Sequence, residues 1–555
     1  MRIQTFFMLL LCSGITLGSA HGAPLERGVA VIDPLTLKEL DLREHRTDTG
    51  AGPDTSLHAD IGFGLNRMLD SAASDNAPLL NDRLFALPSM APIRKALDEE
   101  FERYIAERKK DSPRETVGVG PSFDFQLFDR ALLYSGQTRF VLSGIVNRMD
   151  RAYVAPESCG EVRLLYRLTR IGGVESPPSV PPSQEAVGNS IAKSVTLSEA
   201  LTNTPRLPMT LNIVLKAKGD TASVSCAEIA RRWLAMAELP QGGSDLALKL
   251  MSEGGPLELI KPENIDRIET NLQIAHTPKS ELHDFRTDYL MKVFHYNPQA
   301  KLYEEATLEN QYDRERILND QALGQEFKSW LLDPKHLSEL DRGIVLIPEK
   351  FLKTVTVAPT PIGFVRSSMQ PAFGLVEGDQ GGEPLFKQTD IVTALKQAAD
   401  SGVAFQNIRS PAGFEQRLND ITCGGCHQIR GIGGFHFPGV DWMAEKPSNS
   451  MVVPASPHFF ADQIRRRDVV TALRDGQPVD YSRGFSDRPQ QRGSTELAGT
   501  EYDDGWGAHC YQEHADAADN DPSFTPWSCA AGLACEVMAS AGKSTRMGMC
   551  FIKSR

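Results

Sequence analysis

The spacing of apolar residues predicts helices in some stretches and strands in others. Between Pro92 and Lys110, apolar side chains recur three or four residues apart, with glutamate and arginine between them, which predicts an amphipathic helix. Residues 139–149 and 161–168 are rich in β-branched and aliphatic side chains, and a turn containing proline and glycine separates them. These two stretches predict a β-hairpin.

Similar patterns extend along the rest of the chain. Further strands are predicted at residues 209–215, 265–274, 289–296 and 343–347, and further helices at residues 226–239, 321–332, 389–399, 410–421 and 459–473. Ser410 and Pro411 suit the cap and the first position of a helix, and Phe414, Leu418 and Ile421 then fall on one face. The mixture of elements predicts an α+β fold.

The N-terminus has the pattern of a secretory signal peptide. A basic residue, Arg2, precedes an apolar stretch over residues 3–17, and the small residues Gly18, Ser19 and Ala20 follow. This pattern predicts cleavage after Ala20 and export to the periplasm or the extracellular space. Beyond it, no apolar run in the sequence is long enough to predict a transmembrane helix.

Length and composition bound the number of domains and the class of partner. The 555 residues exceed what one hydrophobic core organises, so two or more domains are expected. With 41% hydrophobic and 24% charged residues, the composition is that of a globular protein. A formal net charge of -13 argues against a nucleic-acid partner, because phosphate backbones attract basic proteins.

Candidate chemistry is concentrated in one short stretch. Residues 421–430 have the sequence I-T-C-G-G-C-H-Q-I-R, in which Cys423, Cys426 and His427 form a C-x-x-C-H element. Two thiols at this spacing can each form a thioether with a haem vinyl group, and the adjoining imidazole then binds the iron. A zinc site would need two further ligands, which the neighbouring sequence does not offer as a pair. A thioredoxin-like dithiol would open a helix after a strand, whereas this element closes a helix.

With this element the chain resembles the c-type cytochromes, over roughly residues 410–473. The resemblance implies one covalently bound haem c, held by Cys423 and Cys426, with His427 as the proximal ligand. It also implies electron transfer or haem-dependent redox activity, with a redox partner protein or a small-molecule electron donor or acceptor. Met443 is favoured as the distal ligand, because an aromatic and turn-rich loop precedes it. The other candidates are His436, Met451 and His458.

A second hypothesis belongs to another class of protein. In it, the chain is a secreted binding or surface protein whose Cys-rich C-terminal end engages a partner. The C-G-G-C-H element is then a disulfide or a structural metal site.

The other cysteines are expected to form disulfides. The chain has 9 cysteines, of which Cys12 falls within the predicted signal peptide. Outside the C-x-x-C-H element, the simplest arrangement pairs Cys159 with Cys226 and places two bridges among four cysteines near the C-terminus, whose connectivity stays open. These four are Cys510, Cys529, Cys535 and Cys550.

Polar residues also gather at the ends of the predicted hairpin. Asn147–Asp150 have the sequence N-R-M-D, and Cys159–Glu161 have the sequence C-G-E. A binding site is one interpretation of this pattern. A buried brace of arginines and carboxylates is favoured over it.

These features together predict that the chain is divided into five parts. The predicted parts are a signal peptide at residues 1–20, a mixed α and β body of unknown role at 21–377, a small all-α cytochrome c-like haem segment at 385–475, a linker at 476–505 and a disulfide-stapled knob at 506–555. The linker is rich in Gly, Pro and Arg without an apolar period. The knob has too few apolar residues to hold a core without disulfides.

Overall fold

The computed structural model of the chain describes residues 27–42, 62–70, 78–111, 113, 116–118, 123, 125–126, 129–171, 206–218, 224–239, 242–276, 287–359, 375–377, 384–427, 457–485, 509–537 and 546–552. The predicted signal peptide lies outside these residues. Within them the chain is an α+β protein with a large, mainly antiparallel sheet and with disulfide-bonded cysteines near the C-terminus. This much of the predicted fold class is confirmed.

The described residues form a sheet of 10 strands. These are β1 (Ala30–Val31), β2 (Val117–Gly118), β3 (Phe125–Gln126), β4 (Thr138–Arg148), β5 (Glu161–Arg170), β6 (Arg206–Lys216), β7 (Ile265–His276), β8 (Thr287–Asn297), β9 (Leu302–Ala306) and β10 (Val355–Pro359). The order is β1-β4-β5-β6-β7-β3-β2, and β8 pairs with β7, β9 and β10. Every pairing is antiparallel except that of β2 with β3. The predicted hairpin of β4 and β5 is confirmed.

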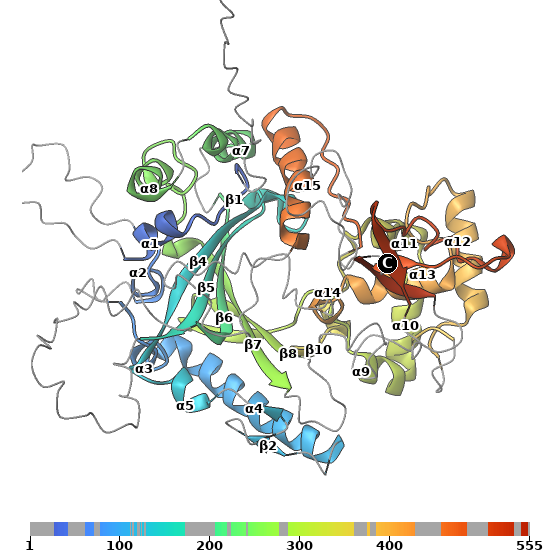
Figure 1. Cartoon of the computed structure of the whole chain (residues 1–555), viewed down its shortest axis with the longest axis horizontal. Coiled ribbons are helices and arrows are strands. Elements are labelled where there is room, and N and C mark those ends of the chain that lie inside the picture. The colour runs from blue at the N-terminus through green and yellow to red at the C-terminus, as the bar shows by residue number, and fades with distance from the viewer. Residues whose placement is uncertain are drawn as a thin grey trace, which may run out of the picture.

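The helices lie partly against this sheet and partly in a separate group. They are α1 (Pro34–Leu42), α2 (Leu65–Leu69), α3 (Asn81–Leu84), α4 (Ala91–Asp111), α5 (Arg130–Leu133), α7 (Cys226–Ala235), α8 (Gly243–Met251), α9 (Arg314–Asn319), α10 (Gln321–Leu331), α11 (Pro334–Arg342), α12 (Gln388–Asp400), α13 (Pro411–Asp420), α14 (Cys423–His427) and α15 (Pro457–Arg474). In Figure 1, α9 to α13 form a group of their own, and α14 lies between that group and the sheet. The helix predicted from Pro92 is confirmed as α4.

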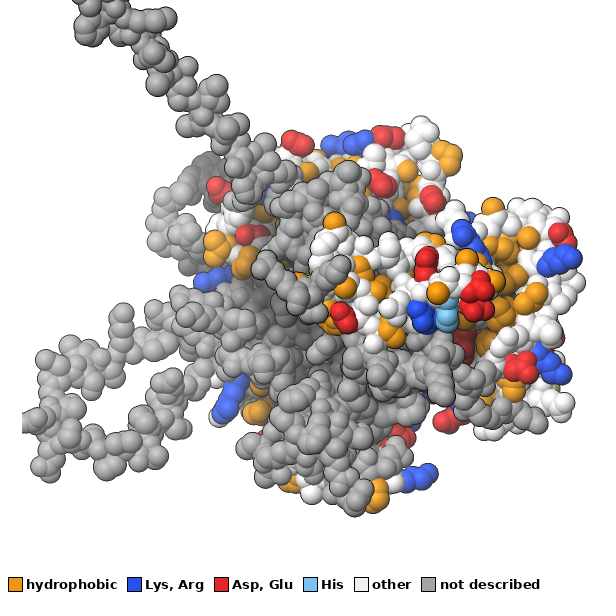
Figure 2. All heavy atoms as spheres, turned by 45° about the vertical axis from the view of Figure 1, so that its right-hand side comes forward, with side chains coloured by type: hydrophobic (Ala, Val, Ile, Leu, Met, Phe, Trp, Pro, Cys, Tyr) orange, Lys and Arg blue, Asp and Glu red, His pale blue; other side chains and the backbone are white. Residues whose placement is uncertain are grey.

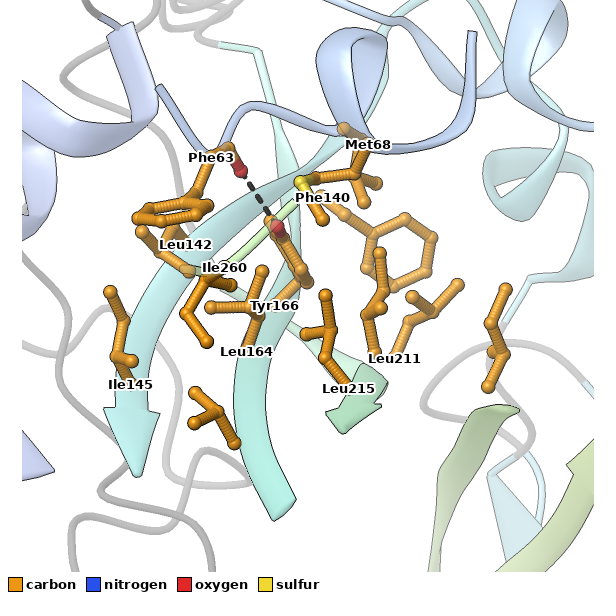
Figure 3. Close-up of a cluster of buried hydrophobic side chains, with 14 of the residues drawn as sticks. Phe63, Met68, Phe140, Leu142, Ile145, Leu164, Tyr166, Leu211, Leu215 and Ile260 are labelled. Atoms are coloured by element: carbon orange, nitrogen blue, oxygen red, sulfur yellow. Dashed lines mark hydrogen bonds between the residues drawn. The ribbon is translucent and has the colours of Figure 1, made fainter. Parts of the chain in front are cut away.

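One face of the sheet, the first face, carries the main hydrophobic core. Alternate residues of β5 and β6 point into it, as Figure 3 shows for Tyr166 and Leu211. The Tyr166 hydroxyl donates a hydrogen bond to Phe63 O at 2.6 Å, so its polar end is satisfied within the core. In β4, an irregularity in the register after Leu142 allows both Leu142 and Ile145 to reach the same core.

A second hydrophobic core lies among helices α9 to α13. Its residues run from Tyr312 to Leu418, so it combines segments on both sides of residue 377. The strand predicted at residues 343–347 is wrong. The Asn310 side chain occupies the hydrogen bonds that a neighbouring strand would make, since it donates to Val345 O at 2.9 Å and accepts from Ile347 N at 2.8 Å.

Helix α15 belongs with the sheet rather than with this helical group. It packs along α7, and its residue Val470 joins the main core. Among the described residues, no helix combines the length and the apolar character needed to cross a membrane. On the face drawn in Figure 2, acidic and basic side chains are interspersed over the described surface.

The C-terminal end forms a small sheet held by two disulfides. Its strands are β11 (His509–Tyr511), β12 (Leu533–Glu536) and β13 (Met547–Ile552). The bridges are Cys510–Cys535 and Cys529–Cys550, which confirms two disulfides among these four cysteines and gives their connectivity. The unit contacts the start of α13, because the Ser410 hydroxyl donates to Asp521 at 2.7 Å.

The disulfide predicted between Cys159 and Cys226 is confirmed, with a sequence separation of 67 residues. It ties the beginning of α7 to the turn before β5. Replacing both cysteines with alanine should lower the free energy of unfolding by about 4 kcal/mol, because the bridge restricts the unfolded chain. Denaturant titration at neutral pH measures this difference. A loss below about 1 kcal/mol would contradict the expected role of the bridge.

Candidate functional site

The C-x-x-C-H element forms one helical turn, α14, which follows α13 closely. Thr422 caps this turn, because its hydroxyl accepts a hydrogen bond from Gly425 N at 2.8 Å and donates one to Asn419 O at 2.6 Å. Residue 425 has to be glycine, since a Cβ atom there would lie 1.9 Å from the Asn419 carbonyl oxygen. The backbone that presents Cys423 and His427 is therefore fixed by its neighbours.

The turn also rests on a loop of the N-terminal body, residues 308–311. Gln311 accepts a hydrogen bond from Gly424 N through Oε1 at 2.8 Å. The Cys423 Sγ lies 3.8 Å from the Glu309 carbonyl oxygen. The loop is more than a hundred residues earlier in the chain, so the tertiary fold, and not local sequence, positions the turn.

Cys423 packs on an apolar patch at the edge of the sheet. The patch consists of Tyr289, Met291, Leu308 and Ala358. Each of these residues is at most 6% exposed. Burial raises the pKa of the Tyr289 phenol, and the positive charge of Arg167 only partly offsets that effect. The phenol is therefore neutral at physiological pH, and Cys423 faces a surface without net charge on this side.

Beside the apolar patch, the second face of the sheet, turned away from the main core, carries several buried polar residues. Strand residues alternate, so the neighbours of core residues such as Leu211 and Leu272 face this side. The polar residues here are Thr210, Asn212, Asn271, Gln273 and Thr356. Each is at most 5% exposed, and one side-chain oxygen of each has no hydrogen-bond partner among the described residues. Native proteins pair nearly all their buried polar atoms, so this face is a candidate binding surface.

At the other end of the second face lies a network of arginines and carboxylates. Glu161 is at its centre and lies 3.2 Å from Arg151, 3.0 Å from Arg163 and 2.9 Å from Arg267. Burial alone would raise the pKa of Glu161, but the three guanidinium groups outweigh it and hold that pKa well below its usual range. Glu161 therefore stays ionised even at mildly acidic pH.

The same network joins α15 to the sheet. Asp150 lies 2.8 Å from Arg148 and 2.7 Å from Arg465 of α15, which also pairs with Asp462 at 2.7 Å. Burial tends to raise the pKa of Asp150, and the surrounding arginines instead hold it well below its usual range. The groups of the N-R-M-D and C-G-E sequences thus form the buried brace that the sequence favours.

Glu309 connects this network to the C-x-x-C-H turn. Its side chain accepts a hydrogen bond from Arg151 Nη1 at 3.1 Å, while its backbone oxygen faces Cys423. Burial would raise the pKa of Glu309, but Arg151 lowers it by more, so the carboxylate stays ionised. The loop beneath α14 is therefore anchored by a partly buried ion pair.

Several residues predicted for the site are not described. They are His436, Met443 and Met451, together with the side chains of Cys426, His427 and His458. Within the described part of the chain, the only cluster of side chains arranged closely enough to hold a metal consists of Cys510, Cys529 and Cys535. All three are in disulfides, which accounts for their proximity.

Comparison with known proteins does not assign this chain to a family. No family model, curated protein or solved structure matches the chain.

Sequence reasoning missed the residues that surround the motif. Gln311, Glu309 and Tyr289 lie in no recognisable motif and reach α14 only through the fold. One available signal was the alternation in β6, where Thr210 and Asn212 separate core residues. Such alternation normally predicts a solvent-exposed face, so the pattern alone does not reveal that this face is buried.

Proposed function

We propose that the chain is an exported mono-haem c-type protein, with one haem c attached through Cys423 and Cys426 and with His427 as the proximal iron ligand. The observation that carries the proposal is a C-x-x-C-H sequence in a single helical turn with a fixed backbone. Two thiols and an imidazole from one turn are the donor set that haem c requires. The predicted signal peptide supports it, because c-type haem is attached outside the cytoplasmic membrane.

The surroundings of Cys423 fit a haem. A porphyrin needs an apolar wall near its thioether edge, and the patch that includes Tyr289 and Met291 offers one. A haem also carries two carboxylates, which need hydrogen-bond donors. The hydroxyl groups of Thr210 and Thr356, which lie on the same face of the sheet, can donate and have no partner among the described residues.

Residues near the C-x-x-C-H turn have defined roles in this proposal. When bound, the haem supplies one-electron redox chemistry at potentials set by its ligands and surroundings. Gln311 holds the N-terminal end of α14, and the Glu309–Arg151 pair holds the loop beneath it. The partner is a redox protein or a small-molecule electron donor or acceptor in the periplasm or outside the cell. Electron transfer is favoured over a haem-dependent reaction.

We propose residues 385–475 as a cytochrome c-like haem segment, on the basis of the motif and the helices that these residues contain. Its helices α12 and α13 contact one another, and α13 leads into the C-x-x-C-H turn. Its third helix, α15, packs along α7 of the sheet body. The segment therefore shares its contacts with the N-terminal body, and we infer that the body supplies part of the haem surroundings.

Export through a host that matures c-type cytochromes tests the proposal. The purified protein should be red, and its haem should stay with the polypeptide in a denaturing gel that is stained for haem peroxidase activity. Colourless protein from that host, with the chain folded and intact, would overturn the proposal.

Met443 is proposed as the distal ligand. Replacing Met443 with alanine should abolish the weak sulfur-to-iron charge-transfer absorption and lower the midpoint potential, because thioether ligation favours ferrous iron. Absorption spectroscopy of the oxidised protein and redox titration measure both effects. An unchanged spectrum would assign the distal position to Met451, His436 or His458, or leave it open to small ligands.

A further inference from the structure

We propose that the second face of the sheet, from β5 to β10, forms one wall of the haem pocket and binds the propionate edge of the haem. This inference rests on the haem attachment proposed above. It gives the N-terminal body a role, because the wall would come from a β-sheet of that body rather than from the helices that carry the motif.

The contacts of α14 place the start of this wall. Helix α14 packs on β10, and Cys423 contacts the patch formed by Tyr289, Met291 and Ala358. These three residues all lie on the second face, because their strand neighbours Leu290 and Val357 contact the main core. A group bonded to the Cys423 sulfur would therefore begin at β8 and β10 on the second face.

The strand register then defines a row of side chains across this face. Thr210 is opposite Asn271, Asn271 is opposite Met291, and Met291 is opposite Thr356. Neighbouring strands are about 4.8 Å apart, so Thr210 on β6 lies about 10 Å from Met291 on β8. That separation is comparable with the span of a haem from its vinyl edge to its propionate edge.

The row carries Thr356 on β10, the apolar Met291 on β8, and the polar residues Asn271 and Thr210 on β7 and β6. At the α14 end, the apolar patch suits the thioether edge of a porphyrin. At the far end, the Thr210 hydroxyl has no hydrogen-bond partner among the described residues, and it can donate to a carboxylate. The Asn212 amide lies next along β6 and can donate to a carboxylate through its nitrogen, while its unpaired oxygen can only accept. Both residues are at least nine-tenths buried. Arg167 is opposite Thr210 in the register and adds a buried positive charge beside them.

The alternative for these polar atoms is water alone. Buried waters do satisfy unpaired groups in many proteins. Five buried polar residues on the sheet face that adjoins the C-x-x-C-H turn instead favour one ligand that carries both apolar and carboxylate parts. The substitutions below separate the two cases. If the haem propionates lie against β6, changes in β6 side chains shift the midpoint potential of the iron; if these side chains bind only water, the potential stays the same.

The test compares variants of the holoprotein on the two faces of the sheet. Asn212→Asp places a negative charge beside the proposed propionates, and Thr210→Val removes one hydrogen-bond donor from them. Thr270→Val is the matched control, because Thr270 is also buried with an unpaired hydroxyl but points to the first face. The measurements are covalent haem content, the visible spectrum and the midpoint potential.

All three variants should retain covalent haem. Asn212→Asp should favour the ferric form about tenfold, which is a fall of about 59 mV for a one-electron couple. Thr210→Val should lower the potential by a smaller amount, and Thr270→Val should leave it unchanged. If Asn212→Asp does not fold, the comparison of Thr210→Val with Thr270→Val decides.

The outcomes separate this inference from the haem assignment. Full haem content with wild-type potentials in both second-face variants would overturn the wall and leave the haem assignment standing. Equal shifts in Thr210→Val and Thr270→Val would also overturn it, because the effect would then be one of general packing. Absence of covalent haem in the wild-type protein would overturn the haem assignment itself.

Discussion

Replacing both Cys423 and Cys426 with alanine should give protein that carries no covalent haem, whereas the wild-type protein carries one haem per chain. The reason is that each thiol supplies one thioether, and without both the imidazole of His427 alone holds the haem reversibly. Haem staining after denaturing electrophoresis measures the loss. A single replacement should leave one thioether and a modified spectrum.

The matched control removes another pair of cysteines. Cys510 and Cys535 form a disulfide in the C-terminal unit, and their replacement with alanine should leave the haem content unchanged. If this control loses haem to the same extent as the Cys423 and Cys426 variant, the loss reflects folding or export and not attachment. Haem retention in the Cys423 and Cys426 variant would contradict the assigned attachment site.

Replacing Glu161 with glutamine should lower the free energy of unfolding by about 3–5 kcal/mol. The carboxylate faces three arginines at the centre of the network, and the substitution removes the negative charge that all three share. One carboxylate, Glu309, then remains beside Arg151, and Glu269 alone remains shared by Arg163 and Arg267. Denaturant titration measures the difference. The matched control is Glu228→Gln, whose carboxylate also pairs with two arginines but lies at the surface, so it should cost less than about 1 kcal/mol. Equal costs in the two variants would contradict a special role for the buried network.

The network also predicts how stability depends on pH. The pKa of Glu161 and that of Asp150 are held well below their usual ranges in the folded protein. A lowered folded pKa means that the stabilisation is complete above the unfolded pKa of about 4 and is lost as the pH falls through the folded value. Wild-type protein should therefore lose stability below about pH 4, and Glu161→Gln should lose less over the same interval. Parallel losses in the two proteins would show that other groups control acid unfolding.

Much of the local structure was predictable from the sequence, because local signals determine it. The start of α13 follows from Ser410, whose hydroxyl accepts a hydrogen bond from Gly413 N at 2.9 Å as a helix cap does. The β4–β5 hairpin follows from two β-branched stretches around a turn. The strand predicted at residues 343–347 is wrong because a distant side chain, that of Asn310, replaces the partner strand.

The candidate site was predictable only in its local part. The spacing of Cys423, Cys426 and His427 carries its own chemistry and needs no tertiary information. Gln311 and Tyr289 reach the turn through loop and sheet packing over more than a hundred residues, which no local pattern encodes. The connectivity of the C-terminal disulfides was open for the same reason, since four cysteines allow three pairings until the strands are placed.

The most direct test of the haem assignment is the intact mass of the exported protein, followed by mapping of its peptides. The proposal predicts a mass that exceeds that of the processed polypeptide by one haem, with the added mass on the peptide that contains Cys423 and Cys426. A mass equal to that of the polypeptide alone, measured on protein from a host that attaches haem to its own cytochromes, would contradict it.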